Sequence, residues 1–358
     1  AIKMRFSKAI HIAGGPHATE FQEECLETFD SLIIGEGEDL IIQAIDDYLG
    51  LRLKSVYRQE KPIDINQFPF PRRKYLKDSA VAMKGLVNLK NTKEFDELLS
   101  TTVIFSRGCP YKCHFCHMPN TKEFGMGLRY RKPELIEEEI EYLKSNYSIQ
   151  GINLLDEIGI PLNENKAFSH LESIGRTGII WRGQCRVDGI TPDIAKKAKE
   201  SGCIAMGLGV ESMSQRALDM INKRITVSRA RETIALLKKN DIEARIYMIM
   251  GLPGEPEDIT EQTWNFIQET QPDLVYLSLF TARPGTEVYE KPKKFGLKHI
   301  DTTWENTMHM YGRYELEIPT LTFEYEKQAP WGKSRDKETI VNEYVELQSR
   351  LREGGFNF

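Results

Sequence analysis

The sequence predicts an α/β protein in which an open, partial barrel of six strand–helix units follows an incomplete doubly wound α/β domain. From about residue 100 onward, short apolar runs typical of buried strands alternate with segments of helical period. Before residue 60, two further apolar runs are each followed by a glycine-containing turn. The 358 residues are 40% hydrophobic and 28% charged, which is ordinary for a globular protein with a sizeable core.

The N-terminal segment predicts the end of a doubly wound domain. Residues 9–13 and 30–34 are expected strands, and the turns GGPH at 14–17 and GEGE at 35–38 follow them. A helix is expected from Asp39, because apolar residues recur at helical spacing at Leu40, Ile41, Ala44, Ile45 and Tyr48. A doubly wound domain normally has about five strands, and only two are predicted here.

The segment after this helix predicts a connector. QFPFPRRKYL at 67–76 is punctuated by prolines and has no sustained period. We therefore expect an incomplete first domain over 1–52, a linker over 53–98, the barrel over 99–290 and a C-terminal capping or substrate region over 291–358.

The barrel is predicted from six strands at 101–106, 151–155, 179–184, 203–209, 243–250 and 274–280. The intervening helices are expected at 133–146, 164–174, 192–201, 214–239 (in one or two pieces) and 257–270. This alternation implies a parallel sheet with right-handed crossovers. A final helix is expected at 336–353, and the aperiodic stretch before it either caps the barrel mouth or covers the edge of the sheet.

Three cysteines follow the first barrel strand: Cys109, Cys113 and Cys116, in the string SRGCPYKCHFCHMPN. Three thiolates on one loop can hold three irons of a 4Fe–4S cluster and leave the fourth iron open. A structural zinc site usually needs four ligands, so His114 or His117 would have to complete one. A two-cluster ferredoxin has a fourth cysteine followed by proline, which this loop lacks. The clustering of the cysteines, 6 in the whole chain, also disfavours a disulfide framework.

Polar groups and glycines also follow the later strands. Asp156 and Glu157 end the second strand, Arg186 follows the third, Glu211 ends the fourth and Gly251 follows the fifth. Since the carboxyl ends of barrel strands share one face, we expect these groups and the cysteines to line one mouth. The structural alternatives are a helix cap or a surface turn for Asp156 and for Glu157, and an ion pair between Arg186 and Glu211. The remaining cysteines at 185 and 203 are expected to be buried core residues.

Composition restricts the function class. The formal net charge of −5 argues against nucleic-acid binding, and no apolar run reaches the ~18–20 residues of a membrane span. The absence of a targeting segment and the need for reduced thiols predict a cytoplasmic protein.

The motifs, in this order over residues 100–290, resemble the radical S-adenosylmethionine (SAM) catalytic domain. They are the cysteine loop, GVES at 209–212, GLPGE at 251–255 and RPGT at 283–286. The strings HIAGGPHAT at 11–19 and DSLIIGEGEDL at 30–40 resemble the second half of the Rossmann-like cobalamin-binding domain that often precedes it. The first half, with the loop that would lie under cobalt, is missing, and His17 is not expected to replace it.

The resemblance implies a role for particular residues. The cluster would be bound by Cys109, Cys113 and Cys116. SAM would be contacted by Phe115, Asp156, Glu157, Arg186, Glu211, Met250 and Gly251. The nucleotide tail of cobalamin would be cradled by Gly14, Gly15, Pro16, Gly35, Glu36 and Gly37.

The resemblance also implies an activity: reductive cleavage of SAM to a 5′-deoxyadenosyl radical, with cobalamin-dependent methylation of an unactivated carbon. The alternatives are a radical SAM cyclase, rearrangement or oxidative enzyme that transfers no methyl group, and a non-catalytic iron–sulfur or zinc protein. A methylthiotransferase is disfavoured, because only Cys25 precedes the cysteine loop. The expected partners are a small-molecule, lipid or peptide substrate and a flavodoxin- or ferredoxin-type reductant, without nucleic acid.

Overall fold

The computed structural model describes residues 5–6, 8–86, 95, 97–117, 127–302 and 321–356. The chain divides into two compact units. The first comprises residues 1–68, 108–110 and 117–129, and the second comprises residues 69–107, 111–116 and 130–358.

The first unit is built on a three-stranded parallel sheet in the order β1 (Ile12–Gly14), β2 (Ser31–Ile34) and β3 (Val56–Arg58). The helix α4 (Glu38–Leu49) follows β2, as the sequence predicts. Alternate residues of β2 serve opposite faces of the sheet: Leu32 and Ile34 pack with Ala18, and Ile33 packs with Ala44.

Two sequence predictions for this unit are wrong. The sequence predicted two strands, and β3 was missed because its three residues, VYR, form no apolar run. The GGPH segment was predicted as a simple turn, but α2 (Pro16–Glu20) begins inside it and α3 (Gln22–Thr28) follows. Pro16 occupies the first helical position, where the missing N–H removes no hydrogen bond.

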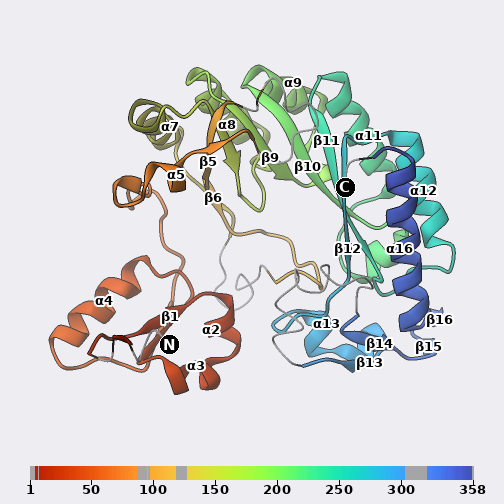
Figure 1. Cartoon of the computed structure of the whole chain (residues 1–358), viewed down its shortest axis with the longest axis horizontal. Helices are drawn as coiled ribbons and strands as arrows, with labels where there is room; N and C mark the ends of the chain where they lie inside the picture. Colours follow the sequence, from red (N-terminus) through yellow and green to blue (C-terminus); the bar gives the residue numbers. More distant parts are fainter. Residues whose placement is uncertain are drawn as a thin grey trace. The chain divides into compact units, whose positions relative to one another are not determined.

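The second unit contains the predicted partial barrel (Figure 1). Its sheet has the order β12-β11-β10-β9-β8-β5-β4, and all pairs are parallel except β4 with β5. The six predicted strands are confirmed as β5 (Leu99–Val103), β8 (Gly151–Leu154), β9 (Ile180–Cys185), β10 (Cys203–Glu211), β11 (Glu243–Met250) and β12 (Leu274–Leu279), and β4 (Met83–Lys84) extends the edge.

The helices between these strands also match the prediction, and they cover one face of the sheet (Figure 1). They are α7 (Pro133–Tyr147), α8 (Glu164–Arg176), α9 (Pro192–Glu200), α10 (Gln215–Met220), α11 (Val227–Lys239) and α12 (Ile259–Thr270). Capping side chains fix several of their starts: Asn163, Thr191, Ser214 and Thr226 each accept a backbone N–H of the first turn.

The two faces of this sheet differ in chemistry. The face under the helices is apolar, and Trp181, Met206, Ile246 and Val275 on it are fully buried. The opposite, inner face carries the alternate residues, which include a row of polar and aromatic side chains: Asn153, Arg182, Arg245, Tyr247 and Tyr276. The helices therefore cover the apolar face, and the polar and aromatic side chains lie on the opposite, inner face.

Short elements lie before and around the cysteine loop. A 3₁₀ turn (Arg73–Tyr75) and α5 (Asp78–Val81) precede the barrel, and β6 (Ser106–Arg107) pairs with β7 (Arg129–Tyr130) on either side of the loop. A second 3₁₀ turn (Val187–Gly189) follows β9.

The C-terminal region packs on the edge of the barrel. It comprises α13 (Glu287–Glu290), a 3₁₀ turn (Pro292–Phe295), the antiparallel pair β13 (Leu297–Ile300) and β14 (Phe323–Tyr325), the short pair β15 (Gln328–Ala329) and β16 (Gly332–Lys333), and α16 (Lys337–Glu353). The helix α16 contacts α12, the edge strand β12 and β14. The aromatic residues Trp304, His309, Tyr311 and Tyr314 lie outside the described residues. None of the helices within the described ranges is long and apolar enough to cross a membrane.

Candidate functional site

The six cysteines fall into two environments. Cys109, Cys113 and Cys116 are partly exposed, whereas Cys25, Cys185 and Cys203 are buried. Burial raises the pKa of Cys185 and of Cys203, which keeps these groups protonated. The prediction that residues 185 and 203 belong to the core is therefore confirmed, and only the loop cysteines have the exposure that thiolate ligands need.

The three cysteines of the loop are the candidate ligands of an iron–sulfur cluster because their thiols are accessible. Cys109 lies in the first unit, and Cys113 and Cys116 lie in the second, where the Cys116 N–H donates to Cys113 O at 3.2 Å. Within the described ranges, no group of three His, Cys, Asp or Glu side chains is arranged to hold a metal ion. The three partly exposed thiols fit the donor set of a cluster with one open iron, and their role remains a prediction.

His114 anchors the cysteine loop to the barrel. Its backbone N–H donates to Ile221 O at 2.8 Å, and its ring Nδ1 lies 2.9 Å from Met220 O. Its Nε2 lies 3.3 Å from Glu287 Oε2. A hydrogen bond from Lys294, together with the charges of His114 and the lysines, lowers the pKa of Glu287 to about 2. Both ring nitrogens thus have partners within the fold, which disfavours His114 as a fourth zinc ligand.

Arg186 is held by several groups at once. Its guanidinium lies 3.5 Å from the centroid of the Tyr111 ring, and it contacts Asp188 through Nε at 2.9 Å and Nη2 at 3.2 Å. Nη2 also donates to Lys223 O at 2.7 Å, and Nη1 lies 4.0 Å from Cys113 Sγ. The carboxylate partner of Arg186 is therefore Asp188, and the sequence alternative of an ion pair with Glu211 is not seen.

Glu211 pairs with Lys223, which the sequence did not single out. Lys223 Nζ lies 2.5 Å from Glu211 Oε1, and both side chains are buried. Glu211 has φ of 70°, a conformation that residues with a Cβ rarely adopt. A Cβ at Gly209 would lie 2.7 Å from Glu211 Oε1 and 2.8 Å from Lys223 Nζ, so a side chain at this position would displace the ion pair from its present place.

Asp156 is buried and Glu157 is half-buried at the end of β8. Asp156 Oδ1 accepts the Phe105 N–H at 3.0 Å, whereas Oδ2 is buried without a hydrogen-bond partner among the described residues. Burial raises the pKa of Asp156 to about 7, and it also raises the pKa of Glu157. An orphaned carboxylate oxygen at a barrel mouth fits an amino group or other donor of a ligand.

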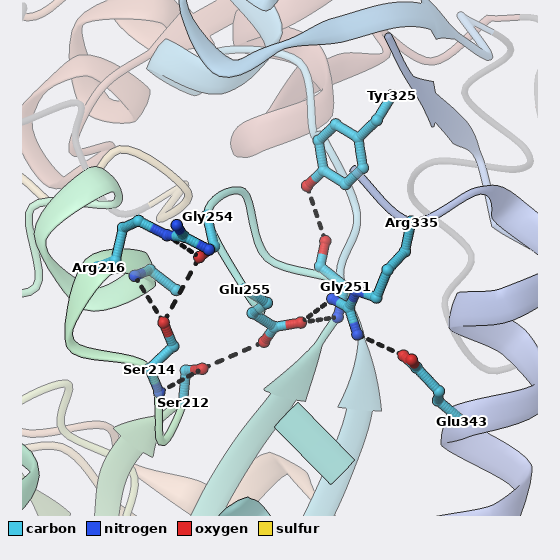
Figure 2. Close-up of polar contacts among 10 residues, drawn as sticks. Ser212, Ser214, Arg216, Gly251, Gly254, Glu255, Tyr325, Arg335 and Glu343 are labelled. Carbon is cyan, nitrogen blue, oxygen red and sulfur yellow. Dashed lines mark hydrogen bonds and ion pairs between the residues drawn. The ribbon is translucent and has the colours of Figure 1, made fainter. Parts of the chain in front are cut away.

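Gly251 is enclosed by its own chain (Figure 2). Its φ is +87°, its N–H donates to Glu255 Oε2 at 2.9 Å, and its carbonyl accepts the Tyr325 hydroxyl at 2.8 Å. A Cβ there would lie 3.0 Å from Ile340 Cγ2 of α16. The Met250 side chain lies in the apolar core with 2% of its surface exposed. The expected adenine contact of these two residues would therefore involve their backbone.

Figure 2 shows that Glu255 connects three separate segments. Its Oε1 accepts the Ser212 hydroxyl at 3.2 Å, and its Oε2 lies 2.5 Å from Arg335 Nη2. Arg335 Nη1 contacts Glu343 of α16. Burial raises the pKa of Glu255, and burial together with the charges of Glu255 and Glu346 raises that of Glu343 to about 7, although Arg335 opposes both shifts. The GVES and GLPGE motifs are thereby tied to the C-terminal region.

In the first unit, the GEGE turn is closed by its own contacts. Glu36 accepts hydrogen bonds from Arg129 Nη1 and Nη2, each at 2.7 Å, and from Gln59 Nε2 at 3.0 Å. Burial opposes ionisation of Glu36, but these hydrogen bonds outweigh it and lower the pKa to about 2. A Cβ at Gly35 would lie 2.6 Å from Gln59 Oε1, and Gly37 immediately precedes α4. Glu36 is thus engaged inside the unit.

The GGP turn is more open. Gly15 has φ of +92°, and no atom lies within 4 Å of the position that a Cβ would take. At Gly14 a Cβ would lie 3.2 Å from Ile33 O, and Pro16 starts α2. Close approach of a ligand to the backbone is therefore possible at Gly15 and is restricted at Gly35.

Comparison with known proteins gives three kinds of match. Residues 103–267 match the sequence model of the radical SAM superfamily. An uncharacterized methyltransferase of Pyrococcus horikoshii is 30% identical over 290 residues, covering 78% of this chain and 62% of that protein. An anaerobic magnesium-protoporphyrin IX monomethyl ester cyclase of Cereibacter sphaeroides is 28% identical over 302 residues, covering 79% and 48%. The chain thus spans about half to three fifths of the length of these two relatives.

Two solved structures share the fold. The radical S-adenosylmethionine methyltransferase TsrM of Kitasatospora setae superposes with a TM-score of 0.61 and 14% identity, over 80% of this chain and 58% of that one. The cobalamin-dependent S-adenosylmethionine radical enzyme OxsB superposes with a TM-score of 0.59 and 17% identity, over 99% and 50%. At such identities the likeness concerns the fold, and the predicted partial barrel is confirmed by it.

Proposed function

The chain carries a radical SAM domain over residues 103–267, and from this premise we propose that it is a cobalamin-dependent radical SAM methyltransferase acting on an unactivated carbon. One observation carries the proposal: the domain match includes the three partly exposed thiols that directly follow the first barrel strand. When bound, a 4Fe–4S cluster and SAM supply a 5′-deoxyadenosyl radical, and cobalamin supplies a methyl group.

The chain's own residues would hold and orient these groups. Cys109, Cys113 and Cys116 would ligate the cluster, and His114 and Arg186 keep their loop against the barrel. The SAM contacts would come from Phe115, Asp156, Glu157, Arg186, Glu211, Met250 and Gly251. The orphaned Asp156 Oδ2 supports a ligand donor at this mouth. Positioning and exclusion of side reactions are the protein's part in such chemistry.

Cobalamin would be held by the first unit, through Gly14, Gly15, Pro16, Gly35, Glu36 and Gly37. The open backbone at Gly15 supports a contact there. Glu36 would act indirectly, because Arg129 and Gln59 already occupy its carboxylate. Its contribution would be to keep the Gly35–Gly37 turn in one conformation.

Several finer points belong to the same proposal. We keep as a proposal the domain boundaries 1–52, 53–98, 99–290 and 291–358, with β3 and β4 of the 53–98 segment pairing with β2 and β5 of the two sheets. We expect a small-molecule, lipid or peptide substrate, a flavodoxin- or ferredoxin-type reductant and a cytoplasmic location. Reductant and location follow from the chemistry, since a reduced cluster requires an electron donor and reduced thiols.

A second candidate is a radical SAM cyclase or oxidative enzyme that transfers no methyl group. It is favoured by the cyclase-named relative, which matches 79% of the chain. The non-catalytic iron–sulfur alternative is supported by nothing beyond the cysteines themselves.

Product analysis separates these functions. The protein is purified anaerobically, reconstituted with iron, sulfide and cobalamin, and incubated with dithionite and SAM. We expect a 4Fe–4S cluster, 5′-deoxyadenosine and S-adenosylhomocysteine by iron analysis and mass spectrometry. 5′-Deoxyadenosine without S-adenosylhomocysteine would favour the second candidate, and zinc in place of iron would contradict both.

Two cysteine variants make a matched control. Cys113→Ala removes a loop thiol and is expected to lose cluster and 5′-deoxyadenosine together. Cys203→Ala removes a buried core thiol of similar size and is expected to keep both. Equal loss of iron in the two variants would show that the cysteine effect is structural.

A further inference from the structure

Arg182 is a buried cation on the inner face of the barrel. It lies in the middle of β9, and strand register places it beside Asn153 of β8 and Ala205 of β10. Only 9% of the residue is exposed. Buried guanidinium groups normally face a carboxylate, because removing an unpaired charge from water is strongly unfavourable.

The structure gives Arg182 a neutral partner instead. Its Nε donates to Asn153 Oδ1 at 2.6 Å, and no carboxylate of the described residues pairs with it. The Asn153 amide is oriented for this role, since its Nδ2 donates to Ser100 Oγ at 3.3 Å and to Thr101 O at 3.4 Å. Within the described ranges, the two terminal nitrogens of Arg182 make no hydrogen bond to the protein.

A second arginine adds to the positive charge. Arg245 of β11 is fully buried on the same face, and its Nη2 lies 3.3 Å from Glu243 Oε2. Burial lowers the pKa of Arg182, and the charge of Arg245 lowers it further. Both effects disfavour the charged form of Arg182, and the negative charge of a bound anion would offset them.

Two tyrosines complete the surroundings. Tyr247 and Tyr276 are opposite each other in register, two residues further along the strands than Arg245, and their rings stack at 5.0 Å with an interplanar angle of 17°. A Cβ at Gly207 would lie 2.6 Å from the Tyr247 hydroxyl oxygen. Glycine at this position therefore leaves room for the phenol beside the arginines.

We propose that Arg182, assisted by Arg245, binds an oxyanion group of the substrate, a carboxylate or a phosphate, inside the barrel. The planar guanidinium presents its free terminal donors in the fork geometry that suits two oxygens of such a group. The identification of this ligand as the substrate rests on the proposed function, whereas oxyanion binding itself does not.

A purely structural arginine would behave differently when removed. Arg182→Met replaces the guanidinium with a shorter, unbranched apolar side chain and leaves no carboxylate of the described residues unpaired, so this variant is expected to unfold at the same temperature as the wild type, or higher, in chloride. The expected signature of a ligand site is loss of anion response without loss of stability.

The test is thermal unfolding of the full chain, without SAM, in chloride, acetate or phosphate at equal ionic strength. The wild type is expected to show a saturable rise of its midpoint with acetate or phosphate. Arg182→Met should lose this rise, and Arg182→Lys should keep part of it. Arg231→Met, which removes an exposed arginine of α11 paired with Glu269, should respond like the wild type.

The two probes distinguish the ligand chemistry. A rise with acetate alone indicates a carboxylate, and a rise with phosphate alone indicates a phosphate. No rise in the wild type, or an equal rise in Arg182→Met, would overturn the proposal. Because the assay contains no SAM, its result is independent of the radical chemistry, so the failure of one proposal is distinguishable from the failure of the other.

Discussion

Two arginines of the second unit, Arg182 and Arg335, are equally hidden from solvent but differ in the carboxylates around them. Their exposed fractions are 9% and 8%. Arg335 lies between Glu255 and Glu343, and Figure 2 shows both contacts. Among the described residues, the Arg182 side chain donates a hydrogen bond to one acceptor, the amide oxygen of Asn153.

The difference separates a structural charge from a functional one. The contacts of Arg335 are complete within the chain, and they join the Gly251 turn to α16. Arg182, on the inner face of the sheet, has no carboxylate partner in the part of the chain that the structure describes. A fold retains a buried unpaired cation at some loss of stability, which is expected where a ligand supplies the missing charge.

The largest loss of stability is expected when Arg335, which pairs with two carboxylates, is removed. Arg335→Met leaves Glu255 buried without its cation, so the free energy of unfolding should fall by about 3–5 kcal/mol. Denaturant unfolding measures it. Arg350→Met removes a partly exposed arginine of α16, which pairs with Glu261 and Glu346, and should lose less than about 1 kcal/mol. Similar losses in both variants would remove the basis of the comparison.

The stability of the protein should depend on pH through the buried group of Glu255, Arg335 and Glu343. Burial raises the pKa of Glu343 from its ordinary 4.5 to about 7 in the folded protein. Its stabilising contribution is therefore complete below pH about 4.5 and is lost as the pH rises through about 7, with a slope of at most about 1.4 kcal/mol per pH unit.

In the variant Glu343→Gln, the side chain at position 343 cannot ionise, so the free energy of unfolding should change less with pH between about 4.5 and 7. Unfolding measured at several pH values compares the two proteins. A wild-type profile that rises with pH relative to the variant would mean that Glu343 is ionised throughout.

A smaller effect is expected from the hydroxyl that holds Gly251. Tyr325→Phe removes the hydrogen bond to the Gly251 carbonyl and should lower the free energy of unfolding by about 1–2 kcal/mol. Tyr289→Phe, on a half-buried tyrosine elsewhere in the C-terminal region, is the matched control. If the Gly251 turn also positions SAM, the KM for SAM should rise in Tyr325→Phe while cluster content stays constant.

The smallest change in stability is expected when Arg182, which pairs with no carboxylate of the described residues, is replaced. Arg182→Met should change the free energy of unfolding by no more than about 0.5 kcal/mol, or increase it, because no partner charge is left behind. The same denaturant experiment places it beside Arg335→Met. A loss as large as that of Arg335→Met would show that Arg182 is structural.

The local pattern was sufficient for most of the barrel. The six strands and the helices between them were predicted because each is an apolar run or a helical period contained in a few consecutive residues. The strand β3 was missed because only Val56, Tyr57 and Arg58 form it, and the pairing with β2 supplies what its sequence lacks. The start of α2 at Pro16 was missed because glycine and proline also signal a turn.

Some residues of the candidate site could likewise be predicted from the sequence, and others could not. The cysteine loop and the residues at strand ends were identifiable from motifs, since each is a short string after a predicted strand. Lys223 and Arg335 were not, although each pairs with a motif glutamate. Both lie in segments without a recognisable motif, and their roles depend on which distant residue they meet.

The sequence by itself determined the strand–helix order, the thiol loop and the resemblance to a radical SAM domain, because these depend on residues close together along the chain. Only the tertiary structure decided which charges are compensated. Arg335 meets Glu255, which lies 80 positions earlier in the sequence, and Arg182 meets an amide where a carboxylate would be expected. Charge pairing in a buried site depends on distances of a few ångströms, and those distances are set by the packing of strands and helices far apart in sequence.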